Sequence, residues 1–266
     1  MNYHGKISNK DITFEIISSK NATKDKPIIF SHGFRAEPKV YRPFLKKLAK
    51  HGYESFALNR FRMKNRPVCL EEHLDLTYDF INLLGICAYH KIGHSLGGYI
   101  TMKIEEKVSG ADKLIAINPA IEVDYGILGF LKASAKIGYN DLSAFVEDKL
   151  DYNSTKIPAY GTCLDFINTA SGFFNKILTT PTTALKVMNE MTDPTKFVYP
   201  DNKNKNLVIL QSMNDEFFNI NLEQMQKWAN SYNNVVVKYI SKQTHNFPVT
   251  RPEYCADLVI KILDTK

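Results

Sequence analysis

The chain has 266 residues, of which 44% are hydrophobic and 12% aromatic, so it can build a sizeable core, and global disorder is excluded. Its 34 Lys and Arg against 28 Asp and Glu give a net charge of +6, and the scatter of its lysines argues against nucleic acid as the main partner. No run of about 18 uncharged apolar residues occurs, and residues 1–10 lack the apolar stretch of a signal peptide. We therefore expect a cytoplasmic protein without a transmembrane segment.

The first elements predict an antiparallel hairpin followed by a strand and a helix. The β-rich runs GKIS and ITFEIIS flank a turn-like Asn-Lys-Asp, which is typical of two antiparallel strands. The apolar run PIIFSHG, residues 27–33, then precedes a helical pattern. Its apolar side chains recur at i, i+3, i+4 and i+7 as Tyr41, Phe44, Leu45 and Leu48.

The same strand-then-helix unit recurs along the chain. Residues 54–59 and 88–93 are predicted strands, and each is followed by a helical stripe. Further strands are predicted at 113–118, 207–212 and 235–240, with helices at 222–231 and 252–263. Such near-continuously apolar strands indicate a parallel sheet with helices on both faces. The predicted fold class is therefore α/β, doubly wound.

The 88 residues from 119 to 206 are far more than the dozen or so that a parallel crossover needs. They contain short helical patterns rich in Phe, Tyr, Leu and Ile. We predict a helical cap at 121–200 inserted into a core formed by 1–120 and 201–266. A second independent domain is the alternative, which the lack of polar linkers disfavours.

Residues 93–97, Gly-His-Ser-Leu-Gly, match the pattern G-x-S-x-G between a predicted strand and a predicted helix. In a nucleophile elbow the serine has a strained backbone at the end of a strand, and glycines two residues away remove the Cβ atoms that would clash. This predicts Ser95 as a nucleophile. The alternative is that the glycines only allow close packing and Ser95 caps the helix.

A serine hydroxyl needs a base that takes its proton, and His245 follows the last predicted strand in a short polar loop. The loop after residues 207–211 offers Asp215 as the acid that orients this imidazole, which gives the order Ser, Asp, His. Glu216 and Asp193 are the alternatives for the acid. Donors to an oxyanion are predicted to be the amides of Leu96 and Phe34, because the first begins the helix after Ser95 and the second follows Gly33.

The segments SHGF, GHSLGG, NDEFF and THNFP resemble, in this order, the motifs of α/β-hydrolase-fold serine hydrolases. The elbow G-H-S-x-G-G resembles that of the lysophospholipase and monoacylglycerol lipase-like branch. The resemblance covers most of the chain. It implies cleavage of carboxylic esters through an acyl-enzyme, with Ser95, Asp215 and His245 as the triad, the amides of Phe34 and Leu96 as the oxyanion hole, and a helical cap. The branch's Asp and Gly-His-Gly loop after the second parallel strand is replaced here by NRFRMKNRP.

The expected substrate is a small ester with an apolar acyl group, because the cap is rich in apolar side chains, with Phe130 and Phe173 as candidate contacts. Arg60 and Arg62, with Lys64 and Arg66, recur at every second residue. They could bind an anionic head group, or they could be a solvated surface loop. Transient contact with a membrane surface is compatible with these features.

No metal or cofactor is expected, because Cys69, Cys87, Cys163 and Cys255 show no metal-ligand spacing and are predicted to be reduced and mostly buried. Two other functions use the same residues or the same scaffold. Thioester hydrolysis or acyl transfer would need the same triad with a different acceptor, and a ligand-binding protein would need no triad at all. The sequence leaves the oligomeric state open.

Overall fold

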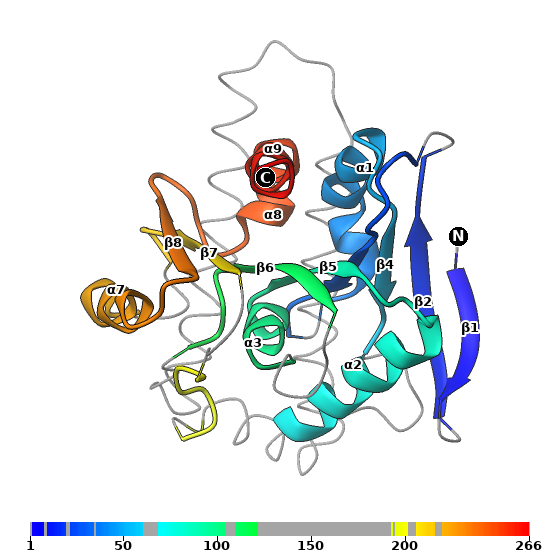
Figure 1. Ribbon diagram of the computed structural model, residues 1–266, viewed down its shortest axis with the longest axis horizontal. Helices are drawn as coiled ribbons and strands as arrows, with labels where there is room; N and C mark the ends of the chain where they lie inside the picture. The colour runs from blue at the N-terminus through cyan, green and yellow to red at the C-terminus, as the bar shows by residue number, and fades with distance from the viewer. Residues whose placement is uncertain are drawn as a thin grey trace, which may run out of the picture.

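A computed structural model describes residues 2–7, 10–19, 22–34, 36–60, 69–104, 110–121, 193, 195–201, 206–215 and 220–265 (Figure 1). The predicted cap at 121–200 lies largely outside these residues. So do the candidate substrate contacts Arg62, Phe130 and Phe173 and the alternative acid Glu216. In the part of the chain that is described, no helix is long and apolar enough to cross a membrane.

An eight-stranded sheet forms the centre of the molecule, in the order β1-β2-β4-β3-β5-β6-β7-β8. The β1·β2 and β2·β4 pairs are antiparallel, and all pairs from β4 to β8 are parallel. The predicted hairpin and parallel sheet are thus confirmed. The strands are β1 (Asn2–Ile7), β2 (Lys10–Ile17), β3 (Ile28–Ser31), β4 (Ser55–Leu58), β5 (Tyr89–His94), β6 (Ala111–Ile117), β7 (Leu207–Ser212) and β8 (Val235–Ile240).

Helices cover both faces of this sheet, as the apolar strands predicted. In Figure 1, α1, α8 and α9 lie on one face, and α2, α3 and α7 lie on the other. Strand β3 leads through the short 3-10 helix η1 (Pro38–Tyr41) into α1. The helices are α1 (Arg42–Lys50), α2 (Leu70–Leu84), α3 (Leu96–Lys103), α7 (Leu222–Asn230), α8 (Phe247–Thr250) and α9 (Pro252–Leu263).

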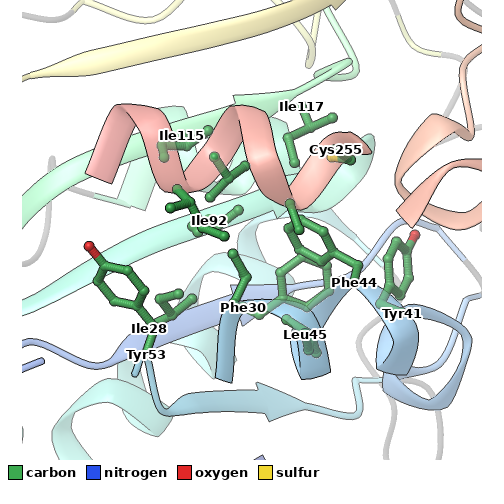
Figure 2. Packing of buried hydrophobic residues seen from close by; sticks show 14 of the residues in the cluster. Ile28, Phe30, Tyr41, Phe44, Leu45, Tyr53, Ile92, Ile115, Ile117 and Cys255 are labelled. Atoms are coloured by element: carbon green, nitrogen blue, oxygen red, sulfur yellow. The ribbon is translucent and has the colours of Figure 1, made fainter. Parts of the chain in front are cut away.

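Alternate residues of each buried strand feed two separate hydrophobic clusters, one on each face, because successive side chains of a strand point to opposite sides. Ile29 and Leu114 join the cluster under α2, α3 and α7, whereas Ile28 and Ile115 join the one under α1 and α9. Figure 2 shows part of the second cluster. There the Phe30 ring lies 4.9 Å from the Tyr41 ring, centre to centre, which fixes Tyr41 at the edge of the core.

The chain reverses its direction of travel across the sheet at β3. After β3 the next strand, β4, lies on one side of it, while β5 lies on the other. At such a switch point the loops after the two adjoining strands lead to opposite faces of the sheet and leave a crevice at the carboxyl ends of the strands. The loops that begin at His32, after β3, and at Ser95, after β5, lie at this position, where α/β sheets bind ligands.

Candidate active site

Ser95 occupies the sharp turn between β5 and α3 in a backbone conformation that side chains rarely adopt, with φ 56° and ψ −121°. Its amide donates to the Ile117 carbonyl at 2.9 Å, and its carbonyl accepts from the Tyr99 and Ala120 amides at 3.0 and 3.1 Å. A positive φ at a residue other than glycine persists only where the surroundings hold it. The turn is held by β6 on one side and by the first turn of α3 on the other.

The two glycines of the predicted elbow are required by backbone contacts. A Cβ on Gly93 would overlap the Gly97 carbonyl, and a Cβ on Gly97 would overlap the Ser31 carbonyl at the end of β3. Both positions therefore demand glycine because the strand-turn-helix packs so closely. This agrees with the predicted geometry of the turn around Ser95.

Asp215 and His245 form a buried hydrogen bond at the same edge of the sheet. The distance from His245 Nδ1 to Asp215 Oδ2 is 2.9 Å, and the two side chains are only 5% and 3% exposed. Because a carboxylate can only accept, the imidazole must carry its proton on Nδ1. In its neutral form His245 then presents Nε2 as an acceptor. The alternative acid Asp193 instead accepts from the amide and hydroxyl of Thr195.

The loop after β3 lies directly against the turn at Ser95. A Cβ on Gly33 would lie 3.3 Å from the Ser95 Cβ, so only a small residue lets the two loops approach this closely. Phe34, the next residue, packs its partly buried ring against the cluster under α3. The segments that hold Phe34 and Leu96 thus follow two neighbouring strands, β3 and β5, and approach each other where Gly33 meets Ser95.

A chain of hydrogen bonds connects the Gly33 loop to the His245 loop. The Gly33 amide donates to the Tyr41 hydroxyl at 3.1 Å, and that hydroxyl lies 2.8 Å from His94 Nδ1. His94 Nε2 lies 2.9 Å from the His245 carbonyl oxygen. Because a carbonyl only accepts, Nε2 carries the proton, and Tyr41 donates to Nδ1. Burial, together with His245, lowers the pKa of His94 well below its usual range, which keeps this imidazole neutral.

The structure also corrects the expectation of an exposed Arg60. This side chain is fully buried, and its guanidinium donates to the His32 carbonyl, while its amide donates to His32 Nε2 at 3.3 Å. Burial lowers the pKa of Arg60 to about 9. Arg60 therefore supports the loop after β3 from inside. The pattern of alternating cations did not reveal this, since it predicts a shared face and not the depth of that face.

Lys91 is a second buried cationic residue at this end of the sheet. Its Nζ lies 2.6 Å from Ser31 Oγ and 3.4 Å from the Ile29 carbonyl. Burial lowers the pKa of this amine well below its usual value, and Arg60 adds to the effect. Lys91 is therefore a buried residue that contacts β3, like Arg60 at His32, and it is not exposed at the carboxyl edge of the sheet.

Three polar residues near the site escaped the sequence reasoning: Tyr41, Asn118 and Gln211. Gln211 on β7 is fully buried, and its Nε2 lies 3.3 Å from Asp215 Oδ2. The sequence pattern places Tyr41 only in an apolar helical stripe. Asn118, directly after β6, gave a detectable signal, because an asparagine followed by proline at the end of an apolar strand marks a turn.

Among the residues that the structure describes, no group of three His, Cys, Asp or Glu side chains is arranged to hold a metal ion. Cys69, Cys87 and Cys255 are unpaired, and Cys87 is exposed rather than buried as expected. At the carboxyl edge of the sheet the structure places the Ser95 hydroxyl, the His245 imidazole and the Asp215 carboxylate, together with backbone amides.

Comparison with solved structures gives the same architecture. A membrane phospholipase A, a bacterial virulence factor, matches with a TM-score of 0.71 at 14% identity, over 99% of this chain and 86% of that one. A serine hydrolase involved in carbazole degradation matches with a TM-score of 0.71 at 15% identity, over 100% and 99%. Naproxen esterase from Bacillus subtilis matches with a TM-score of 0.64 at 13% identity, over 99% and 91%.

The chain has the α/β-hydrolase fold. Identities this low show the fold alone. No model of a protein family matches the chain, and no curated protein sequence matches it. Ser95, Asp215 and His245 directly follow or lie in the loops after β5, β7 and β8, in the chain order Ser, Asp, His.

Proposed function

We propose that the protein is a serine hydrolase that cleaves carboxylic esters through an acyl-enzyme on Ser95. The observation that carries the proposal is the buried Asp215–His245 hydrogen bond at the sheet edge that also presents Ser95 in a strained turn. A merely structural serine would need neither the strained turn nor, at the same edge of the sheet, an imidazole with a fixed tautomer. The phospholipase and esterase among the structural neighbours agree with this reaction class.

In the proposed acylation step, His245 Nε2 accepts the Ser95 hydroxyl proton while Oγ attacks the ester carbonyl carbon. The oxyanion that forms receives hydrogen bonds from the Phe34 and Leu96 amides, and the start of α3 favours negative charge there. When the tetrahedral intermediate collapses, the ester C–O bond breaks. The alcohol leaves with the proton from His245, and the acyl group stays on Ser95.

Deacylation repeats these steps with water as the nucleophile. His245 takes a proton from water, whose oxygen attacks the acyl carbon, and the bond to Ser95 Oγ then breaks as His245 returns the proton. The balance is ester plus water to carboxylic acid plus alcohol. Asp215 stays ionised throughout, because its task is to hold the Nδ1–H and to stabilise the imidazolium.

We infer further that the acyl group is lipid-like, by similarity of the elbow G-H-S-x-G-G to the lysophospholipase and monoacylglycerol lipase-like branch and by the phospholipase neighbour. Phe130 and Phe173 stay predicted contacts of the acyl chain, and Arg62 stays a predicted contact of an anionic head group. Turnover of neutral and anionic esters of graded chain length, by wild type and by Phe130→Ala, Phe173→Ala and Arg62→Gln variants, tests these assignments.

The reaction class is tested with an active-site-directed fluorophosphonate, followed by mass spectrometry of the labelled peptide. We expect label on Ser95 in the wild type and none in Ser95→Ala or His245→Ala. The matched control is His51→Ala, because His51 lies exposed at the end of α1 and should not affect labelling. A folded wild type that takes up no label, or a Ser95→Ala variant that still reacts, would contradict the proposal.

A further inference from the structure

The side chain of Asn118 connects the loop that carries the proposed acid with the loop that carries the proposed base. Its Oδ1 accepts from the Ser212 amide at 2.7 Å, and its Nδ2 donates to Ser212 Oγ at 3.0 Å. The same Nδ2 lies 3.3 Å from the Thr244 carbonyl and 2.7 Å from the His245 carbonyl. One amide thus holds β7 three residues before Asp215 and holds the His245 peptide itself.

The His245 carbonyl oxygen accepts two hydrogen bonds, from Asn118 Nδ2 at 2.7 Å and from His94 Nε2 at 2.9 Å. A carbonyl has two lone pairs, so both are used. Two donors, one at the end of β5 and one directly after β6, fix the plane of the peptide that follows the His245 Cα. The orientation of the His245 imidazole is then fixed both by these hydrogen bonds to its backbone carbonyl and by the hydrogen bond of Nδ1 to the Asp215 carboxylate.

The backbone of Asn118 is held in a way that serves this role. It has a positive φ of 41°, in the left-handed region where asparagine is among the few tolerated residues. The side chain is fully buried, and the backbone amide donates to the Leu210 carbonyl at 2.9 Å. After this left-handed residue the side-chain amide reaches across the end of β7 to the loop that follows β8. Strain of this kind is maintained where the surroundings over-determine it.

We propose that Asn118 is a positioning residue that sets the Asp215–His245 pair by holding the peptide of His245 against the end of β7. This inference rests on the proposed function, because it assigns a role within the same site. Asn118 does not take part in bond making. Without its Nδ2 donor, the His245 loop would lose one of its two cross-strand anchors, and the imidazole would spend less time in line with Ser95.

The variant Asn118→Asp separates positioning from packing, since it keeps the size and the acceptor for the Ser212 amide. The oxygen that replaces Nδ2 faces the carbonyls of Thr244 and His245, which repel it when the carboxyl is ionised. A protonated carboxyl can donate to one of them, so the defect should ease as the pH falls. The titratable side chains joined to this network among the described residues are Tyr41, His94, Asp215 and His245.

The experiment measures fluorophosphonate labelling from pH 8 to pH 5, together with the low-field proton NMR signal of the His245 Nδ1–H, assigned by its loss in His245→Ala. For Asn118→Asp we expect labelling about 10- to 100-fold slower than wild type at pH 8, with the ratio to wild type rising at lower pH. The Nδ1–H signal should be broadened by exchange at pH 8. Asn221→Asp is the matched control, because Asn221 is exposed and its Oδ1 only caps α7.

Two results would overturn the inference: labelling within about twofold of wild type at every pH, or a pH-independent loss with an unchanged Nδ1–H signal. If the wild type fails to label while the signal still responds to Asn118→Asp, the proposed function fails and the positioning role stands. If circular dichroism shows Asn118→Asp unfolded, Ser212→Ala decides. It removes one partner of the amide, and we expect slower labelling and a broadened Nδ1–H; no change in either would overturn the inference.

Discussion

The imidazoles of His94 and His245 lie 4.9 Å apart, centre to centre, and Nε2 of His94 donates to the backbone carbonyl oxygen of His245 at 2.9 Å. Through Tyr41, which contacts the other nitrogen of His94, this pair is linked to the Gly33 amide. Each of these side chains is buried. Two buried polar side chains therefore tie the loop before Phe34 to the loop of the proposed base.

Tyr41→Phe should loosen the attachment of two loops, the Gly33 loop and the His245 loop. The change removes the acceptor for the Gly33 amide and the donor to His94 Nδ1, and it leaves two buried polar groups unsatisfied at a cost of about 1–3 kcal/mol each. We expect kcat for an ester to fall by roughly 10-fold, with little change in KM, because the loss concerns the reacting geometry. Tyr53→Phe is the control, since that hydroxyl bonds Asp264 at 2.7 Å, outside the proposed site. Equal kinetics for the two variants would contradict the coupling.

The fold was predictable because its signals are local and repeated. Apolar runs of strand length alternate with helical stripes, and the predicted helix at 252–263 coincides with α9. The elbow at Ser95 was predictable because steric demands fix glycine at both Gly93 and Gly97. Here each residue type follows from a contact within one strand-turn-helix unit, so the sequence carries the information by itself.

The polar contacts that connect separate strands were not predictable. Arg60 looked like a surface cation, yet it is fully buried against His32. Asn118 meets Ser212, 94 positions later in the chain, and nothing in the local pattern of either residue indicates the other. Such contacts depend on strand order and register, which place distant residues side by side only once the sheet is formed.

Asp215→Asn should leave the fold intact and remove most of the activity. The amide can donate to the imidazole and then favours the tautomer with its proton on Nε2, which cannot accept from Ser95. We expect kcat to fall by roughly 10³- to 10⁴-fold. Asp193→Asn makes the same chemical change at a carboxylate that bonds Thr195, and it should retain full turnover. An Asp215→Asn variant with wild-type kcat would show that another group orients His245.

Gly97→Ala should damage both stability and activity. Its Cβ would overlap the backbone carbonyl of Ser31, which cannot move without disturbing β3. We expect the free energy of unfolding to fall by about 2–4 kcal/mol and fluorophosphonate labelling to be lost. Gly85→Ala is the comparison, because its φ of 63° is strained for alanine while no atom lies within 4 Å of the added Cβ. It should cost only about 1 kcal/mol and leave labelling unchanged.

The stability of the fold should decrease as the pH falls below about 6.5, the ordinary pKa of histidine. His90 is buried beside Tyr53, and burial outweighs its contact with Asp112, 3.6 Å away, and lowers its pKa to about 4. Between these two values the unfolded chain binds the extra proton and the folded chain does not, so the free energy of unfolding rises with pH across that window. Burial also lowers the pKa of His32 and His94, which adds to the slope with the same sign.

Urea denaturation of wild type at pH 7, 6 and 5, compared with His90→Gln, isolates the contribution of His90. Because glutamine does not titrate, we expect the loss of stability between pH 7 and pH 5 to be smaller in the variant by about 1–2 kcal/mol. His51→Gln should keep the wild-type slope, because His51 is exposed. Parallel stability curves for wild type and His90→Gln would mean that His90 takes up its proton equally in the folded and unfolded states, contrary to the burial that this side chain has against Tyr53.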